Sequence, residues 1–208
     1  MHPDRESRHD VVVGRASFLA DPAVDEHVER MYTTDLSTQG YVAHLTRVWG
    51  HSPEALAALS YVLKRATDTA GLDVRQRSLL VTACASAIGD SYCSLAFGSK
   101  LATTAGEDVA AGLLGGDDTA LSPAERTLAA WARRVAREPN ATTAEDVDAL
   151  RASGYDDGQI FAITLFVALR LAFSTVNDAL GAAPDAELAE RAPASVRAAV
   201  TYGRPPAR

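Results

Sequence analysis

The chain has 208 residues, of which 47% are hydrophobic and 23% charged, and its formal net charge is −7. This length and composition predict one compact domain with a sizeable core. The acidic balance, without a cluster of Lys and Arg, argues against nucleic acid, because phosphate binding depends on concentrated positive charge. The longest apolar run, 160–169, is too short for a membrane span and predicts a buried helix.

Cysteine content and the N-terminal sequence bear on the compartment. Only two cysteines are present, which argues against the disulfide framework of a secreted domain. The first ten residues are too polar for a signal peptide, so we expect a cytoplasmic protein with reduced thiols. On one continuous helix Cys84 and Cys93 would lie about 13 Å apart, and we therefore expect no disulfide between them.

Apolar residues recur three and four positions apart along most of the chain, which predicts an all-helical (all-α) fold. Helix starts are indicated by capping residues before Pro or before an acidic residue, and helix ends by Gly71, Gly154 and Gly181. In chain order these signals predict helices over 22–33, 39–49, 53–69, 74–88, 91–104, 107–114, 123–137, 143–153, 157–180 and 194–200.

Three parts follow from this pattern: an N-terminal extension (1–20), a single helical domain (21–200) and a C-terminal tail (201–208). The prolines of the tail prevent regular helix, so it is either disordered or, as we favour, laid across a neighbouring chain. The turn 71–76 is similar to 154–159, and each precedes a long apolar helix. This similarity is explained either by duplication of a helical hairpin or by the same helix-start residues used twice independently.

Gly89 and Asp90 predict a helix end followed by an N-cap, which places Cys93 at the third position of the new helix. A helix N-terminus lowers the pKa of a thiol, whereas the nearby Asp90 carboxylate raises it. The net shift stays open, as does the choice between a nucleophile and a small core residue. Asp90 is interpreted as the cap, with a general acid or base as the alternative. We interpret Tyr92 as a packing aromatic with its hydroxyl at the surface, the alternative being a hydrogen-bond donor to substrate.

Arg170 interrupts the apolar run and begins a polar stripe with Ser174, Asn177 and Asp178. A buried guanidinium needs partners, so a structural ion pair, within the protein or at a subunit contact, is the leading interpretation. The alternative is an anchor for the carboxylate of a small-molecule substrate, with Asn177 and Phe97 also binding it.

No spacing of His, Cys or carboxylates predicts a metal site, since loop residues separate His44 from His51. The glycines at 112–116 lack the Lys and Ser or Thr of a phosphate-binding loop. We therefore expect neither a metal nor another cofactor.

The stretch 89–98, Gly-Asp-Ser-Tyr-Cys-Ser-Leu-Ala-Phe-Gly, resembles the redox motif of the alkylhydroperoxidase D and carboxymuconolactone decarboxylase superfamily. That motif is Cys-x-x-Cys-x-x-x-His with a glutamate twelve residues before the first cysteine. Its four places hold Asp90, Cys93, Phe97 and Ser78 in this chain. Further likeness at 51–54, 72–77 and 173–178 extends over the domain, and the whole is similar to a one-cysteine variant branch.

The resemblance implies an alkylhydroperoxidase D-like helical fold, a homo-oligomer (trimer or hexamer) and an antioxidant oxidoreductase. Phe97 cannot relay protons, Ser78 is no base, and Asp90 cannot resolve a sulfenic acid, so ordinary two-cysteine peroxidase turnover is not expected. We predict single-cysteine peroxide or thiol chemistry at Cys93, with Asp90 and Tyr92. Two alternatives are decarboxylase-like acid/base chemistry on a small carboxylate and a catalytically inert oligomeric binding protein.

Overall fold

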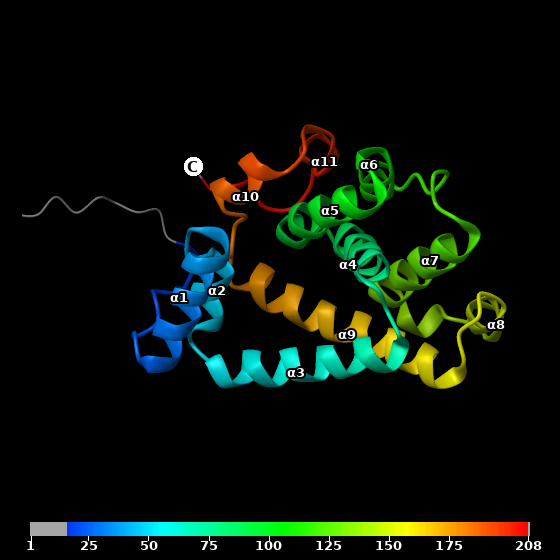
Figure 1. The fold of residues 1–208 in the computed structure, drawn as a ribbon, viewed down its shortest axis with the longest axis horizontal. Coiled ribbons are helices and arrows are strands. Elements are labelled where there is room, and N and C mark those ends of the chain that lie inside the picture. The colour runs from blue at the N-terminus through cyan, green and yellow to red at the C-terminus, as the bar shows by residue number, and fades with distance from the viewer. Residues whose placement is uncertain (1–15, 208) are drawn as a thin grey trace, which may run out of the picture.

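The structure, a computed structural model, describes residues 16–207 and is built from helices (Figure 1). No strand occurs within this range, which confirms the all-helical prediction. Most of the predicted N-terminal extension, and Arg208 of the tail, lie outside the described residues. The elements are α1 (Glu26–Gln39), α2 (His44–Trp49), α3 (Pro53–Ala70), α4 (Val74–Ile88), α5 (Ser91–Ala105), α6 (Glu107–Gly115), α7 (Pro123–Arg137), the 3-10 turn η1 (Pro139–Ala141), α8 (Ala144–Ala152), α9 (Asp157–Ala179), α10 (Ala186–Arg191) and α11 (Ala194–Ala199).

The long helix α9 is the centre of the architecture. It packs against α3 on one side and against α4 and α7 on the other, while α5 lies on α4 and is covered by α6 and α11 (Figure 1). By length and composition α9 is the one helix of residues 16–207 that could cross a membrane. Ile163, Phe166 and Val167 are buried among the neighbouring helices, whereas Phe161 is 70% exposed, so the predicted buried helix is buried on one face.

Capping explains why most helices begin where the sequence predicts. Asp73, Ser122 and Asp156 each form a capping box with a Gln or Glu three residues later. The predicted start of the first helix at 22 is wrong, because Asp25 is its cap and accepts from the N–H groups of His27 and Val28, each at 2.9 Å. The short α10 was not predicted, and no side chain caps its start.

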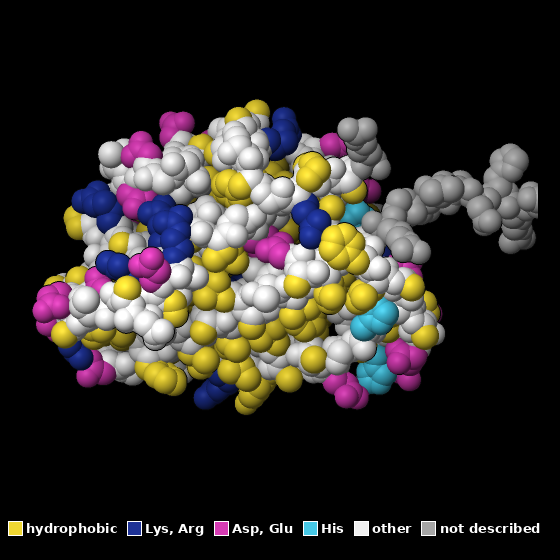
Figure 2. Space-filling view, turned by 180° about the vertical axis from the view of Figure 1, so that it is seen from behind, with side chains coloured by type: hydrophobic (Ala, Val, Ile, Leu, Met, Phe, Trp, Pro, Cys, Tyr) yellow, Lys and Arg dark blue, Asp and Glu magenta, His cyan; other side chains and the backbone are white. Residues whose placement is uncertain are grey.

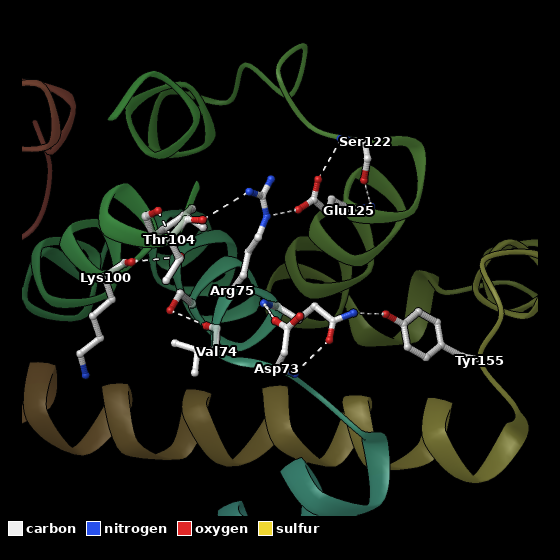
Figure 3. A network of polar contacts seen from close by, with 11 residues as sticks. Asp73, Val74, Arg75, Lys100, Thr104, Ser122, Glu125 and Tyr155 are labelled. Carbon is white, nitrogen blue, oxygen red and sulfur yellow. Dashed lines mark hydrogen bonds and ion pairs between the residues drawn. The ribbon is translucent and has the colours of Figure 1, made fainter. Parts of the chain in front are cut away.

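The two similar turns lie against each other in space. Gln76 Nε2 donates to the Tyr155 hydroxyl at 3.1 Å, and Gln159 Nε2 donates to the Ala70 carbonyl at 3.3 Å. Arg75 then ties α4 to its neighbours, because its Nε donates to Glu125 Oε1 at 2.6 Å and its Nη1 to the Thr104 carbonyl at 3.5 Å (Figure 3). These contacts fix the register of α4 beside α5, on which the candidate site depends.

The described part of the C-terminal tail packs against α5 and α9 of its own chain. Ser91 Oγ donates to the Arg204 carbonyl at 2.7 Å, Tyr202 donates to Ser94 Oγ at 3.1 Å, and Arg204 Nη2 donates to the Asp178 carbonyl at 3.1 Å. Gly203 allows this path, since its φ is +72° and a Cβ there would lie 2.5 Å from a backbone oxygen. The tail therefore closes over the first turn of α5.

Candidate functional site

The start of α5 sets the position of Cys93. Gly89 ends α4 with φ +78°, and Asp90 Oδ1 accepts the backbone N–H of Cys93 at 2.8 Å, as an N-cap does. Cys93 is therefore at the third position of the helix, as predicted. Both side chains are buried, and the second oxygen of Asp90, Oδ2, has no hydrogen-bond partner.

Arg170 of α9 meets the cysteine from the other side. Its Nη2 lies 3.2 Å from Cys93 Sγ, and its guanidinium is held between two aromatic rings, 4.8 Å from the centroids of both Phe97 and Phe173. Ser174, one turn further along α9, has its Oγ 3.7 Å from the same sulfur. None of the ion pairs within residues 16–207 includes Arg170, so the predicted internal ion pair is wrong. The rings and the sulfur take the place of a carboxylate.

Burial of Cys93 decides the direction in which the pKa of its thiol is shifted, which the sequence leaves open. It raises the pKa of Cys93 to about 12, the Asp90 carboxylate acts in the same direction, and Arg170 and Ser174 offset only part of this. The thiol is therefore protonated at neutral pH, with the guanidinium placed to stabilise the thiolate once it forms. Cys84 on α4 is also a free, buried thiol, and burial raises its pKa to about 12.

Two hollows meet at this point, and Phe97, Lys100 and Arg170 line both of them. The inner pocket, of about 310 Å³, is also lined by Tyr92, Cys93 and Phe173. The outer cleft, of about 620 Å³, lies between α3, α4, α5 and α9 and includes Ser78, which occupies the place of the superfamily glutamate. The arrangement gives a small molecule access to the neighbourhood of the sulfur.

The Tyr92 hydroxyl is buried and donates to a buried carboxylate, so the prediction that it lies at the surface is wrong. Its phenol donates to Asp185 Oδ2, whereas the backbone N–H of His44 donates to Asp185 Oδ1 at 2.9 Å. Burial raises the pKa of Tyr92 and that of Asp185. Tyr92 thus lines the inner pocket while its hydroxyl joins α5 to the segment before α10.

Asn177 is fully buried and lines neither hollow. Its Oδ1 accepts from Trp49 Nε1 at 2.9 Å, and the Trp49 ring stacks on Phe173, with centroids 5.2 Å apart and planes at 7°. The structure therefore places Asn177 behind the aromatic stack that holds Arg170, away from any ligand in the two hollows.

Sequence reasoning missed Lys100, Phe173 and Arg77 as residues of this region. The spacing could have identified two of them: Lys100 follows Cys93 by seven positions and Phe173 follows Arg170 by three, so each lies on the same helix face as a predicted site residue. Within residues 16–207 no three His, Cys, Asp or Glu side chains gather as metal ligands. His51 instead holds its loop, with Nε2 lying 3.0 Å from the Ala20 carbonyl oxygen.

Comparisons with known proteins give the fold. No protein-family model and no curated protein matches the chain. An uncharacterized peroxidase-related protein from Ralstonia eutropha JMP134, described as an alkylhydroperoxidase AhpD core, is similar with a TM-score of 0.73 and 19% identity over 85% of this chain and 96% of that chain. A peroxidase-related protein from Silicibacter sp. TM1040 gives 0.72 and 17% over 86% and 97%.

The debrominase Bmp8 shares the fold as well. A cysteine-to-alanine variant of it, in complex with 2,3,4-tribromopyrrole, gives a TM-score of 0.64 and 18% identity over 88% of this chain and 95% of that chain. At these identities the similarity is one of fold. The alkylhydroperoxidase D-like fold that the sequence resemblance implied is therefore confirmed.

Proposed function

We propose that this protein is a thiol-dependent reductase, an oxidoreductase with an antioxidant role, in which Cys93 reduces a small hydroperoxide. One observation carries the proposal: Arg170 Nη2 lies 3.2 Å from Cys93 Sγ at the junction of the two hollows. A guanidinium cannot be deprotonated in a protein, so it supplies a fixed positive charge where the thiolate forms.

The surrounding residues have distinct roles in this proposal. Phe97 and Phe173 hold the guanidinium in place, and Ser174 Oγ is a further hydrogen-bonding group beside the sulfur. Asp90 positions Cys93 through the cap and also keeps the resting thiol protonated. Tyr92 lines the inner pocket, and its hydrogen bond to Asp185 holds its ring in place there. A protonated resting thiol limits adventitious oxidation, since the thiolate is the reactive form.

The chemistry balances with an external thiol as reductant. The Cys93 thiolate attacks the terminal oxygen of the hydroperoxide, so that an S–O bond forms and the O–O bond breaks, and the departing alkoxide takes a proton to give an alcohol. The sulfenic acid then condenses with an external thiol to give a mixed disulfide and water. A second external thiol releases Cys93 and leaves as the disulfide.

Turnover by this route is slow, because no described residue supplies the missing parts. Asp90 stands where the resolving cysteine would be, and Cys84 and Cys93 are both free, buried thiols on successive helices. Phe97 and Ser78 provide neither a proton relay nor a base. The external thiol has to enter through the hollows beside Arg170.

Reductive debromination is a second candidate, favoured by one observation on a neighbour: a variant of Bmp8 is in complex with 2,3,4-tribromopyrrole. The electron count is the same as for a peroxide. The thiolate takes bromine to form an S–Br bond, the C–Br bond breaks, and the ring carbon takes a proton. An external thiol then displaces bromide, and a second one releases the cysteine. The aromatic side chains of Phe97 and Phe173, which line the inner pocket beside Arg170, suit a planar ring.

The test is steady-state consumption of cumene hydroperoxide with a monothiol reductant, compared between the parent, Cys93→Ser and Cys84→Ser. We expect slow consumption in the parent and in Cys84→Ser, and the uncatalysed rate in Cys93→Ser. Consumption that survives in Cys93→Ser would refute thiol catalysis and favour acid/base chemistry. The same three proteins with tribromopyrrole test the second candidate.

We also infer that the protein is a cytoplasmic homo-oligomer, as a trimer or hexamer. A broad band of hydrophobic side chains crosses one face of the molecule (Figure 2). Phe161 on α9 is 70% exposed and Tyr61 on α3 is 66% exposed, and a large contiguous exposed apolar patch marks an interaction surface. Two free thiols suit a reducing compartment.

A further inference from the structure

We propose that the outer cleft is an anion site that takes a small organic carboxylate with a flat apolar body. This inference rests on the proposed function in naming the kind of substrate that reaches Cys93, and it is carried chiefly by Arg77 and Lys100, which the thiol chemistry does not use.

Three cations of the outer cleft have no acidic partner. Arg77, Lys100 and Arg170 line it, and none of the ion pairs formed within residues 16–207 includes any of them. Lys64, at the same cleft, contrasts with them, because its Nζ pairs with Asp68 Oδ2 at 2.7 Å. The acid one turn from Lys64 neutralises it, whereas Arg77 follows Asp73 by four positions and donates only to its backbone carbonyl, so Arg77, Lys100 and Arg170 form no ion pair among the described residues.

The hydrogen bonds of these cations leave donors for a ligand. Arg77 uses only Nε, toward the Asp73 carbonyl at 3.3 Å, while Arg170 Nε is buried and has no partner. The Lys100 ammonium lies over the Phe97 ring, 4.5 Å from its centroid, and its side chain extends from α5 toward α9 (Figure 3). The two Nη groups of Arg77 and the Lys100 ammonium thus form no hydrogen bond or ion pair with the described residues and are available to an acceptor.

Electrostatics also favour an anion here. The pKa of Lys100 is lowered by loss of water and then by repulsion from Arg170 and Arg77, which shows that the three charges act on one another. A carboxylate bound between Lys100 and Arg77 reverses this repulsion. Arg170 stays available to the Cys93 thiolate, because its Nη2 is directed at the sulfur.

The rest of the cleft sets the shape of the ligand. Its walls carry the apolar side chains of Leu63, Val74, Phe97 and Phe166 beside the cations. A volume of about 620 Å³ is ample for a single aromatic ring with a carboxylate. Since Phe97, Lys100 and Arg170 also line the inner pocket, the far end of such a molecule reaches the side on which Cys93 lies.

The experiment measures benzoate binding by isothermal titration calorimetry at low ionic strength, with benzamide and inorganic phosphate as comparison ligands. We expect benzoate to bind at least tenfold more tightly than either, because only benzoate combines the charge with the apolar ring. Lys100→Gln and Arg77→Gln should each weaken benzoate binding about tenfold, or about 1.4 kcal/mol. Arg65→Gln is the matched control: it removes the same charge from an exposed position on α3 outside the cleft, and should bind as the parent does.

Cys93→Ser separates this proposal from the thiol chemistry, since it should keep benzoate binding while losing reductase activity. Benzoate binding that is absent from the parent, or unchanged in both Lys100→Gln and Arg77→Gln, would overturn the anion site. Equal binding of benzamide or of phosphate would do so too. If benzoate binds as expected but Cys93→Ser still consumes hydroperoxide, the anion site stands and the proposed function falls.

Discussion

The carboxylate of Asp90 restrains the Cys93 thiol, and Asp90→Asn should release that restraint. Asp90 is fully buried at the N-cap of α5, where its Oδ1 accepts the Cys93 N–H at 2.8 Å. Asparagine keeps a capping oxygen, so the helix start should survive the substitution. What changes is the charge, which raises the pKa of Cys93 together with burial.

The size of the effect follows from Coulomb's law. Two like charges about 5 Å apart in a medium of effective dielectric constant about 20 repel by roughly 3 kcal/mol, or about two pKa units. The Cys93 pKa of about 12 should therefore move toward about 10 in Asp90→Asn. A thiolate of lower pKa is also a weaker nucleophile, and this takes back about half of the gain. Below pH 9 the net increase in alkylation rate is about tenfold.

The assay is the rate of iodoacetamide alkylation as a function of pH from pH 7 to pH 10. Both proteins carry Cys84→Ala, so that Cys93 is the only thiol that reacts. In the parent the rate should rise about tenfold per pH unit without a plateau, because the thiol pKa lies above the range. A slower or unchanged rate in a folded Asp90→Asn variant would refute the electrostatic argument. A Cys93 that is unreactive in both proteins at every pH would be a packing residue, and the thiol mechanism would be wrong.

Three further predictions concern the neighbouring residues. Arg170→Gln removes the positive charge 3.2 Å from Cys93 Sγ, so the Cys93 pKa should rise by about one to three units and alkylation at pH 9 should slow about three- to thirtyfold. Burial, and then Asp90, raise the pKa of Asp178 to about 6, so the fold disfavours the charged form; Asp178→Asn should increase the free energy of unfolding in urea at pH 8 and change it little at pH 4. Phe161→Asp places a charge at an aromatic position of α9 that is 70% exposed, and light scattering should show the oligomer shifting toward single chains; a parent protein that is already monomeric would contradict the assembly prediction.

The fold was predictable where local chemistry sets the boundaries. The helices α4 and α7 match the predicted ranges 74–88 and 123–137, because Asp73 and Ser122 form capping boxes from residues only three positions apart in the sequence. The tail was not predictable in the same way. Its path depends on Gly203 passing close to the backbone at Gly89 and on Tyr202 reaching Ser94, which are contacts between residues far apart in the chain.

The candidate site shows the same division. The motif placed Cys93 at the third position of α5 and identified Arg170 as a polar intrusion in an apolar helix, and both statements are local. The partner of Arg170 is a sulfur 77 positions away, and that of Tyr92 is a carboxylate 93 positions away. Those pairings arise from how α5 packs against α9 and the segment before α10. The pKa of Cys93 follows from burial, which is also a property of the packing.

The most direct test of the proposed chemistry is a single-turnover oxidation of the reduced protein with one equivalent of cumene hydroperoxide and no added thiol. Dimedone traps any sulfenic acid, and peptide mass spectrometry locates it. The account predicts that dimedone labels Cys93, that Cys84 stays unlabelled, and that Arg170→Gln reduces the labelling because the thiolate loses its counter-charge. Labelling of Cys84 alone, or equal labelling of Cys93 in the parent and in Arg170→Gln, would contradict it.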